Sequence, residues 1–197
     1  DNFKWTTKLG YNLNSNDVNR KITYDDSNKN VRGEFDSWSL GGSTEVEYTQ
    51  KINDRISLRP SIGAVLDYIS QDSYSENGAD GLNLNVDSVD ALSSKVGIGL
   101  AADISAYKSA KHEIKIVPRA DYLYELGDPY KDKSVNLAAF SDNIDVWSRN
   151  TGKNDLNLGL DLQYEYMEKL TLFAGYNAGV LEDNKTQNIN AGFKYVF

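Results

Sequence analysis

The feature that most constrains this chain is a two-residue alternation of apolar and polar side chains that recurs eight times. In LNLGLDLQYEY (156–166), every second residue is leucine or tyrosine, and the residues between are Asn, Gly, Asp, Gln and Glu. Successive side chains of a β-strand point to opposite faces, so this period predicts strands with one apolar and one polar face. The segments are 3–13, 38–48, 56–68, 95–105, 114–126, 156–166, 170–180 and 188–197.

The lengths of the segments and of their connections favour a transmembrane barrel. Each segment runs about ten residues, which a tilted strand needs to cross a bilayer. Short polar turns lie at 49–55, 107–113 and 167–169, whereas 14–36, 70–94 and 127–154 read as long acidic loops; the short last loop, 181–186, is an exception. Short turns at one rim and long loops at the other are typical of outer-membrane barrels. We therefore expect an all-β fold, an antiparallel transmembrane β-barrel, in one domain over 1–197.

Composition excludes several classes of function. The net charge of the 197 residues is −8, which disfavours a nucleic-acid partner because such partners need a basic surface. The absence of cysteine leaves no disulfide and no thiolate metal site. No run of about 18 apolar residues predicts a transmembrane helix, but alternating barrel strands escape that test. We expect no cofactor, no metal site and no catalytic residue.

The charges on the polar faces of the segments predict which face points inward. Seven cations and eight carboxylates nearly cancel there, although the whole chain is acidic. Such balance suits a narrow lumen, where unpaired charges are costly, better than an ordinary solvated surface. Glycines on the same faces suit a crowded interior. The expected lumen charges are Glu45, Glu47, Arg59, Asp67, Lys95, Asp103, Arg119, Asp121, Glu125, Asp161, Glu165 and Lys194, together with Lys4, Lys8 and Lys115.

The apolar faces are expected to meet lipid. They carry Leu, Ile and Val in mid-strand and tyrosines toward the strand ends, where aromatic side chains border the headgroups. The chain ends FKYVF, with apolar residues at every second position. This ending resembles the signal by which the barrel assembly machinery recognises its substrates. The signal residues would be Ile189, Ala191, Phe193, Tyr195 and Phe197.

From Trp38 to Phe197 the chain resembles the translocator (β) domain of autotransporters, the type V secretion family. The resemblance rests on a glutamate-and-tyrosine strand, a leucine-proline strand ending in tyrosine, a serine-to-glycine strand and the closing LTLFAGYNAGV…INAGFKYVF. The residues concerned are Glu45, Glu47, Tyr48, Leu58, Pro60, Tyr68, Ser93, Gly97 and Gly99. The family implies a non-enzymatic pore in the bacterial outer membrane that exports or displays an N-terminal passenger. Its partners would be outer-membrane lipid, the barrel assembly machinery and the passenger segment.

The chain departs from that family in strand number, which leaves alternatives open. A family barrel has twelve strands and a helix in its lumen, whereas eight strands and no helix are predicted here. Either these are the C-terminal eight of twelve, or a reduced barrel closes with eight. A closed eight-stranded barrel is filled by side chains and conducts no polypeptide, so it would instead be a stand-alone barrel whose long loops bind a surface or host partner. A soluble lipocalin-like carrier is a third alternative.

Residues outside the barrel pattern suggest no chemistry. The single histidine, His112, is expected to be a solvated turn residue. Five loop carboxylates could bind calcium weakly, but their spacing fits no EF-hand, and they are expected to form a solvated acidic loop. Loop aromatic side chains would contact a partner or anchor their own loops. These carboxylates and aromatic residues are Asp72, Glu76, Asp80, Asp87, Asp90, Tyr74, Tyr130, Phe140 and Trp147.

Overall fold

The computed structural model describes residues 2–24, 27–129, 131–140, 142–146, 152–181 and 184–196. Within these ranges, no helix combines the length and the apolar character needed to cross a membrane. The expected loop aromatics Tyr130 and Trp147, and the terminal Phe197, lie outside the described residues.

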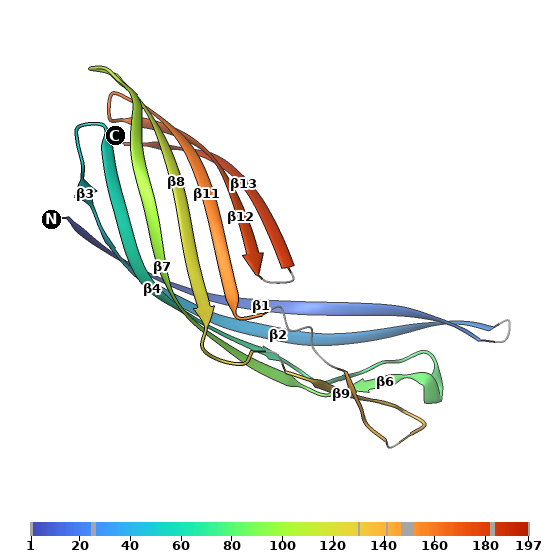
Figure 1. Cartoon of the computed structure of the whole chain (residues 1–197). Helices are drawn as coiled ribbons and strands as arrows, with labels where there is room; N and C mark the ends of the chain where they lie inside the picture. Colours follow the sequence, from blue (N-terminus) through green and yellow to red (C-terminus); the bar gives the residue numbers. More distant parts are fainter. Residues whose placement is uncertain are drawn as a thin grey trace.

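Eight long antiparallel strands follow one another in a single sheet, which curls into a half-barrel (Figure 1). Each strand pairs with the next along the chain, as expected of an up-and-down barrel wall. A two-residue strand, β3 (Gln50–Lys51), pairs beside β4. The eight strands in order are β1 (Phe3–Tyr24), β2 (Ser27–Tyr48), β4 (Ile56–Gln71), β7 (Val89–Lys108), β8 (His112–Glu125), β11 (Asn154–Tyr166), β12 (Leu170–Leu181) and β13 (Asn184–Tyr195).

The sheet is open. Strands β1 and β13 form its two ends, and over the described residues they do not pair with each other. The predicted all-β fold and its eight antiparallel strands are therefore confirmed, while closure of these eight strands on themselves is not what the chain adopts.

The two rims differ as expected. The β2–β4, β7–β8 and β11–β12 turns lie at one end with both termini, and the long connections lie at the other (Figure 1). We call these ends the turn rim and the loop rim. Strand length falls from 22 residues in β1 to 12 in β13, so the wall is tallest at β1 and β2.

The prediction of a loop over 14–36 is wrong. Strands β1 and β2 continue in unbroken register from Phe3 opposite Tyr48 to Tyr24 opposite Ser27. At about 3.3 Å per residue, 22 residues span roughly 70 Å, about twice what a membrane crossing needs. The outer half of this hairpin, residues 14–24 with 27–36, is therefore a two-stranded ribbon beyond the loop rim. Most of its residues are polar and no sustained apolar–polar alternation runs through it, so the sequence did not predict strands there.

The other two expected loops also contain ordered structure. A second, four-stranded sheet has the order β10-β9-β6-β5. We call this sheet, together with a 3-10 turn (Asp80–Leu82), the outer lobe. Its strands are β5 (Tyr74–Ser75), β6 (Leu84–Val86), β9 (Lys133–Leu137) and β10 (Ile144–Val146).

Candidate functional site

The sheet curls toward its polar face, and two residues demonstrate it. In the strand register, Glu45 on β2 lies in the same row as Leu123 on β8, four residues from Arg119. Three strand spacings of about 4.8 Å and four residues of about 3.3 Å would put the Cα atoms of Glu45 and Arg119 roughly 19 Å apart in a flat sheet. Yet the Arg119 Nη2 donates to Glu45 Oε1 at 2.6 Å. The polar face is therefore concave.

Arg119 is the centre of a charge network on this face. Its Nε also donates to Asp121 Oδ2 at 2.6 Å, so one guanidinium joins carboxylates from β2 and β8. The side chains of Arg119 and Glu45 are each about one-third exposed. Glycines 63, 97 and 99 occupy the strands between them, and their missing side chains leave the space that the long side chains cross.

Other charges on the concave face are also paired. Arg59 bridges Asp103 at 2.8 Å and Glu47 at 3.3 Å. Lys115 lies 3.5 Å from Glu165. Lys95 lies 3.2 Å from Asp155. The Arg59 and Lys115 pairs join neighbouring strands, whereas the Lys95 pair crosses β8 to reach β11.

Two further carboxylates have no ion pair among the described residues and lie over glycines instead. A Cβ on Gly41 would clash with the Asp67 carboxylate, and a Cβ on Gly175 would clash with Asp161. The glycines therefore let neighbouring side chains fold down onto the wall. Lys194, on the edge strand β13, likewise has no ion pair within the part of the chain that the structure describes.

Glu125 is a buried anchor and not an open lumen group. Its side chain accepts hydrogen bonds from Ser93 Oγ at 2.5 Å, from the Ser94 amide at 2.8 Å and from the Gly127 amide at 2.9 Å. The residue is 2% exposed. Its hydrogen bonds hold the end of β8 against β7 at the loop rim.

Sequence reasoning missed two charged residues of the concave face. Asp155 and Glu113, partners of Lys95 and Lys115, lie one residue outside the segments that the alternation delimited. Both stand at sequence positions whose side chains point to the polar face. Extending each alternating segment by one residue would have found them.

The opposite, convex face is apolar and uncovered. Leu9 is 85% exposed, Ile98 64% and Leu160 53%. A lipocalin-like carrier would bury its apolar side chains inside the barrel, so this geometry is the reverse of that alternative. On β13, the convex face carries Ile189, Ala191, Phe193 and Tyr195, all of them exposed.

The outer lobe packs on the ribbon, on the face that continues the polar face of the wall. The buried Val31 and the glycine Gly33 share this face with Glu45. The Tyr74 ring lies against Gly33 and stacks on Phe35 with centroids 4.7 Å apart. The lobe therefore stands on the side of the ribbon that faces the barrel axis.

Glu76 ties the lobe to the ribbon, which corrects the expectation of a solvated acidic loop. The residue is 3% exposed. Arg20 donates to both of its oxygens, at 3.1 and 2.5 Å, and the Leu84 amide donates to Oε2 at 2.8 Å. The Arg20 hydrogen bond, with help from the Leu84 amide, holds the pKa of Glu76 below its ordinary value despite the opposing effect of burial.

His112 is likewise not a solvated turn residue. It begins β8, is half-buried, and its Nδ1 lies 2.7 Å from the Tyr164 hydroxyl. Its ring also lies 5.1 Å from that of Tyr166. His112 and the two tyrosines form an aromatic group at the turn rim with no carboxylate or nucleophile in these contacts.

Comparison with known proteins decides the family. Residues 1–177 match the family described as Autotransporter beta-domain. The chain belongs to this family. No curated protein matches the chain.

Membership accounts for the architecture described above. An autotransporter β-domain is a translocator and anchor, not itself an enzyme, and the family implies the bacterial outer membrane. The half-barrel, with a concave charged face and a convex apolar face, is what an outer-membrane translocator role requires.

Proposed function

We propose that this autotransporter β-domain exports or displays an N-terminal passenger segment of its own polypeptide across the outer membrane. The observation that carries the proposal is the division of the wall into a concave face of paired charges and an uncovered apolar face. Glu45, Arg59, Arg119 and their partners line a hydrated lumen. A passenger that crosses as an extended chain would stay hydrated there and would meet charges that are already paired. The free-energy cost of desolvating its polar groups is therefore small.

The lumen is completed by further strands. The free edges of β1 and β13 expose unpaired backbone groups, and each such group costs several kcal/mol in lipid. A twelve-stranded barrel, of which these are the C-terminal eight strands, satisfies both edges and has room for a polypeptide. A stand-alone barrel of eight strands, acting through its loops, is not favoured because β1 and β13 do not pair with each other.

Two further partners follow from the convex face. Outer-membrane lipid covers the exposed leucines and isoleucines. The barrel assembly machinery reads the C-terminal strand through Ile189, Ala191, Phe193, Tyr195 and Phe197. Deleting Phe197 is expected to slow insertion in cells far more than it destabilises the refolded chain, since one rim residue contributes little to packing. Normal surface levels after the deletion would contradict this role.

Export is tested by placing an epitope in the N-terminal passenger segment, ahead of all the barrel strands, in the full polypeptide that carries this chain. Protease added to intact cells should remove the epitope if it has crossed the membrane. A matched control carries the epitope in the β7–β8 turn at Ser109, where the turn rim should protect it. A chain that inserts correctly but leaves the N-terminal epitope protected would overturn the proposal.

A further inference from the structure

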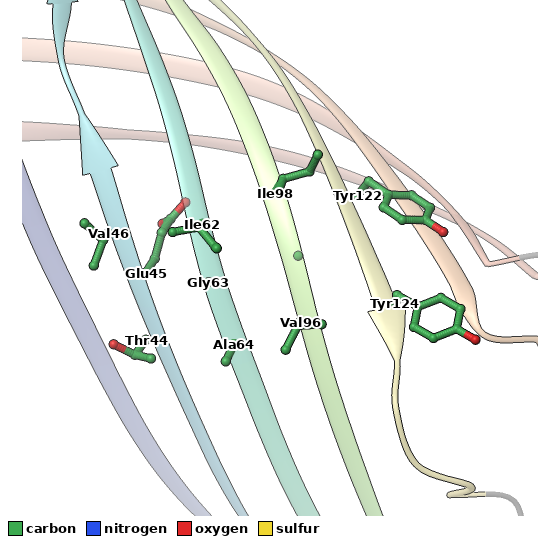
Figure 2. Close-up of a pocket in the computed structure, with 11 residues that line it drawn as sticks. Thr44, Glu45, Val46, Ile62, Gly63, Ala64, Val96, Ile98, Tyr122 and Tyr124 are labelled. Atoms are coloured by element: carbon green, nitrogen blue, oxygen red, sulfur yellow. The ribbon is translucent and has the colours of Figure 1, made fainter.

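A large hollow lies on the convex apolar face of the wall, not in the lumen. It has a volume of about 580 Å³ and crosses β2, β4, β7 and β8 (Figure 2). This size falls in the range of roughly 300–1,000 Å³ that is typical of ligand pockets. Its lining is almost entirely apolar. We call it the outer trough.

The strand register explains why the surface is hollow here. Thr44, Ala64, Val96 and Tyr124 lie in one row across the four strands, and the first three are small. The next row contains Ile62 and Ile98, each 64% exposed. The row of small residues is therefore a channel bordered by a ridge. A second apolar hollow of about 370 Å³ lies on its other side, bordered by Leu9, Leu66 and Leu126.

The trough runs obliquely through the depth of the wall. Tyr124 lies one residue from the loop-rim end of β8, whereas Thr44 lies four residues from the turn-rim end of β2. At the first end, the Tyr122 hydroxyl bonds to Asn154 Oδ1 at 2.5 Å, and tyrosines at that height border lipid headgroups. At the other end, Trp5 Nε1 donates to Thr44 Oγ1 at 2.7 Å.

We infer that the outer trough binds one acyl chain of an outer-leaflet lipid, with the headgroup beside Tyr122 and Tyr124. This inference rests on the proposed location of the wall in the outer membrane. The trough is continuous with the lipid-facing surface, where no water is present to fill a hollow, and an empty hollow forfeits dispersion contacts. A narrow channel below the level of Ile62 and Ile98 admits a thin linear chain. A second copy of the convex wall would rest on that ridge and leave the floor unfilled.

The test compares two substitutions that add the same ring to the same face. Ala64→Phe fills the trough floor. Ala120→Phe is the control, because Ala120 is exposed on the convex face in the row of Pro60 and Leu100, outside the trough lining. Each purified chain is mixed in detergent with palmitoyl-oleoyl-phosphatidylethanolamine, and retained lipid is counted by native mass spectrometry. We expect one retained lipid for the parent and Ala120→Phe, and at least a fivefold lower lipid-bound fraction for Ala64→Phe.

Further readouts separate the possible failures. Heat-modifiable migration establishes that each variant folds, and Ala64→Met replaces Ala64→Phe if the ring prevents folding. Equal lipid retention by all folded variants would overturn the inference. It would also be overturned if the parent chain bound a second copy of itself instead of a lipid and Ala64→Phe removed that dimer. Flotation with vesicles of the same phospholipid tests the membrane location itself. A parent chain that does not float defeats the proposed function, whereas floating chains with equal lipid retention defeat the trough alone.

Discussion

Arg119 on β8 and Glu45 on β2 form an ion pair at 2.6 Å across two intervening strands. No other described ion pair within the eight-stranded wall joins strands so far apart in the sheet. The pair shows that the wall is curved, because these two side chains would be too far apart to meet on a flat sheet.

This pair is expected to contribute measurably to stability. With both side chains about one-third exposed, its coupling should lie between that of surface and buried pairs, at about 1–2 kcal/mol. The measurement is a double-mutant cycle of Arg119→Ala and Glu45→Ala, followed by urea unfolding of the refolded chain. The matched control is the exposed turn pair Lys51–Asp54, which should show no measurable coupling. Equal coupling in the two cycles would contradict the role of the Arg119 pair.

The lobe should loosen in acid. Glu76 has a folded pKa below its ordinary 4.5, so its contribution is fully present above that value. It is lost as the pH falls through the lowered folded pKa. We expect Glu76→Gln to weaken the lobe by roughly 1–3 kcal/mol at neutral pH and to flatten this acid dependence. Hydrogen exchange of 74–86, corrected for intrinsic rates, measures both effects. Asp80→Asn, at an exposed carboxylate, should change neither.

Gly33 is expected to be required for docking of the lobe on the ribbon. A Cβ at this position would lie 2.7 Å from the Tyr74 ring, whereas a Cβ on Gly10 would meet nothing within 4 Å. Gly33→Ala should therefore cost about 1–3 kcal/mol through overpacking and raise protease cleavage within 72–88. Gly10→Ala, on the same face of the same hairpin, should leave cleavage unchanged. Similar cleavage of the two variants would show that the Tyr74 contact does not hold the lobe.

The wall was predictable from the sequence and the lobe was not, for a physical reason. Strands 156–166 and 170–180 obey a local rule, because each must show one face to an apolar environment and the other to a polar one. The ribbon and the lobe are surrounded by water, so their strands carry no such alternation. Their stability depends on contacts such as Arg20 with Glu76, 56 residues apart in the chain. Asp155 and Glu113 were missed only because they lie just past the apolar pattern.

The edges of the sheet make a prediction about closure. Thr7 and Ala191 lie on the edge strands β1 and β13, which do not pair with each other in the described chain. Because the chain contains no cysteine, Thr7→Cys with Ala191→Cys allows a clean cross-linking test. We expect no disulfide within one chain. Efficient cross-linking within a monomer would establish a closed eight-stranded barrel and remove the need for further strands.

Charge on the convex face should be costly. Leu160 lies in mid-strand on β11 and is 53% exposed to what we take to be lipid. Leu160→Arg should lose about 2–4 kcal/mol in vesicles, the cost of a cation near the bilayer midplane. Asp161→Leu, at the next residue and on the concave face, should cost less. Urea unfolding measures both losses. A larger loss for Asp161→Leu than for Leu160→Arg would mean that the concave face, and not the convex face, meets lipid.

The most direct test of the central claim, that β11 shows Leu160 to lipid and Asp161 to water, is single-cysteine labelling in the assembled membrane. Leu160→Cys and Asp161→Cys are each exposed to a membrane-impermeant maleimide in intact outer membranes and again after detergent denaturation. We expect Cys at 161 to react in the membrane and Cys at 160 to react only after denaturation. Labelling at 160 with protection at 161 would contradict the inside-polar, outside-apolar wall on which the proposed function depends.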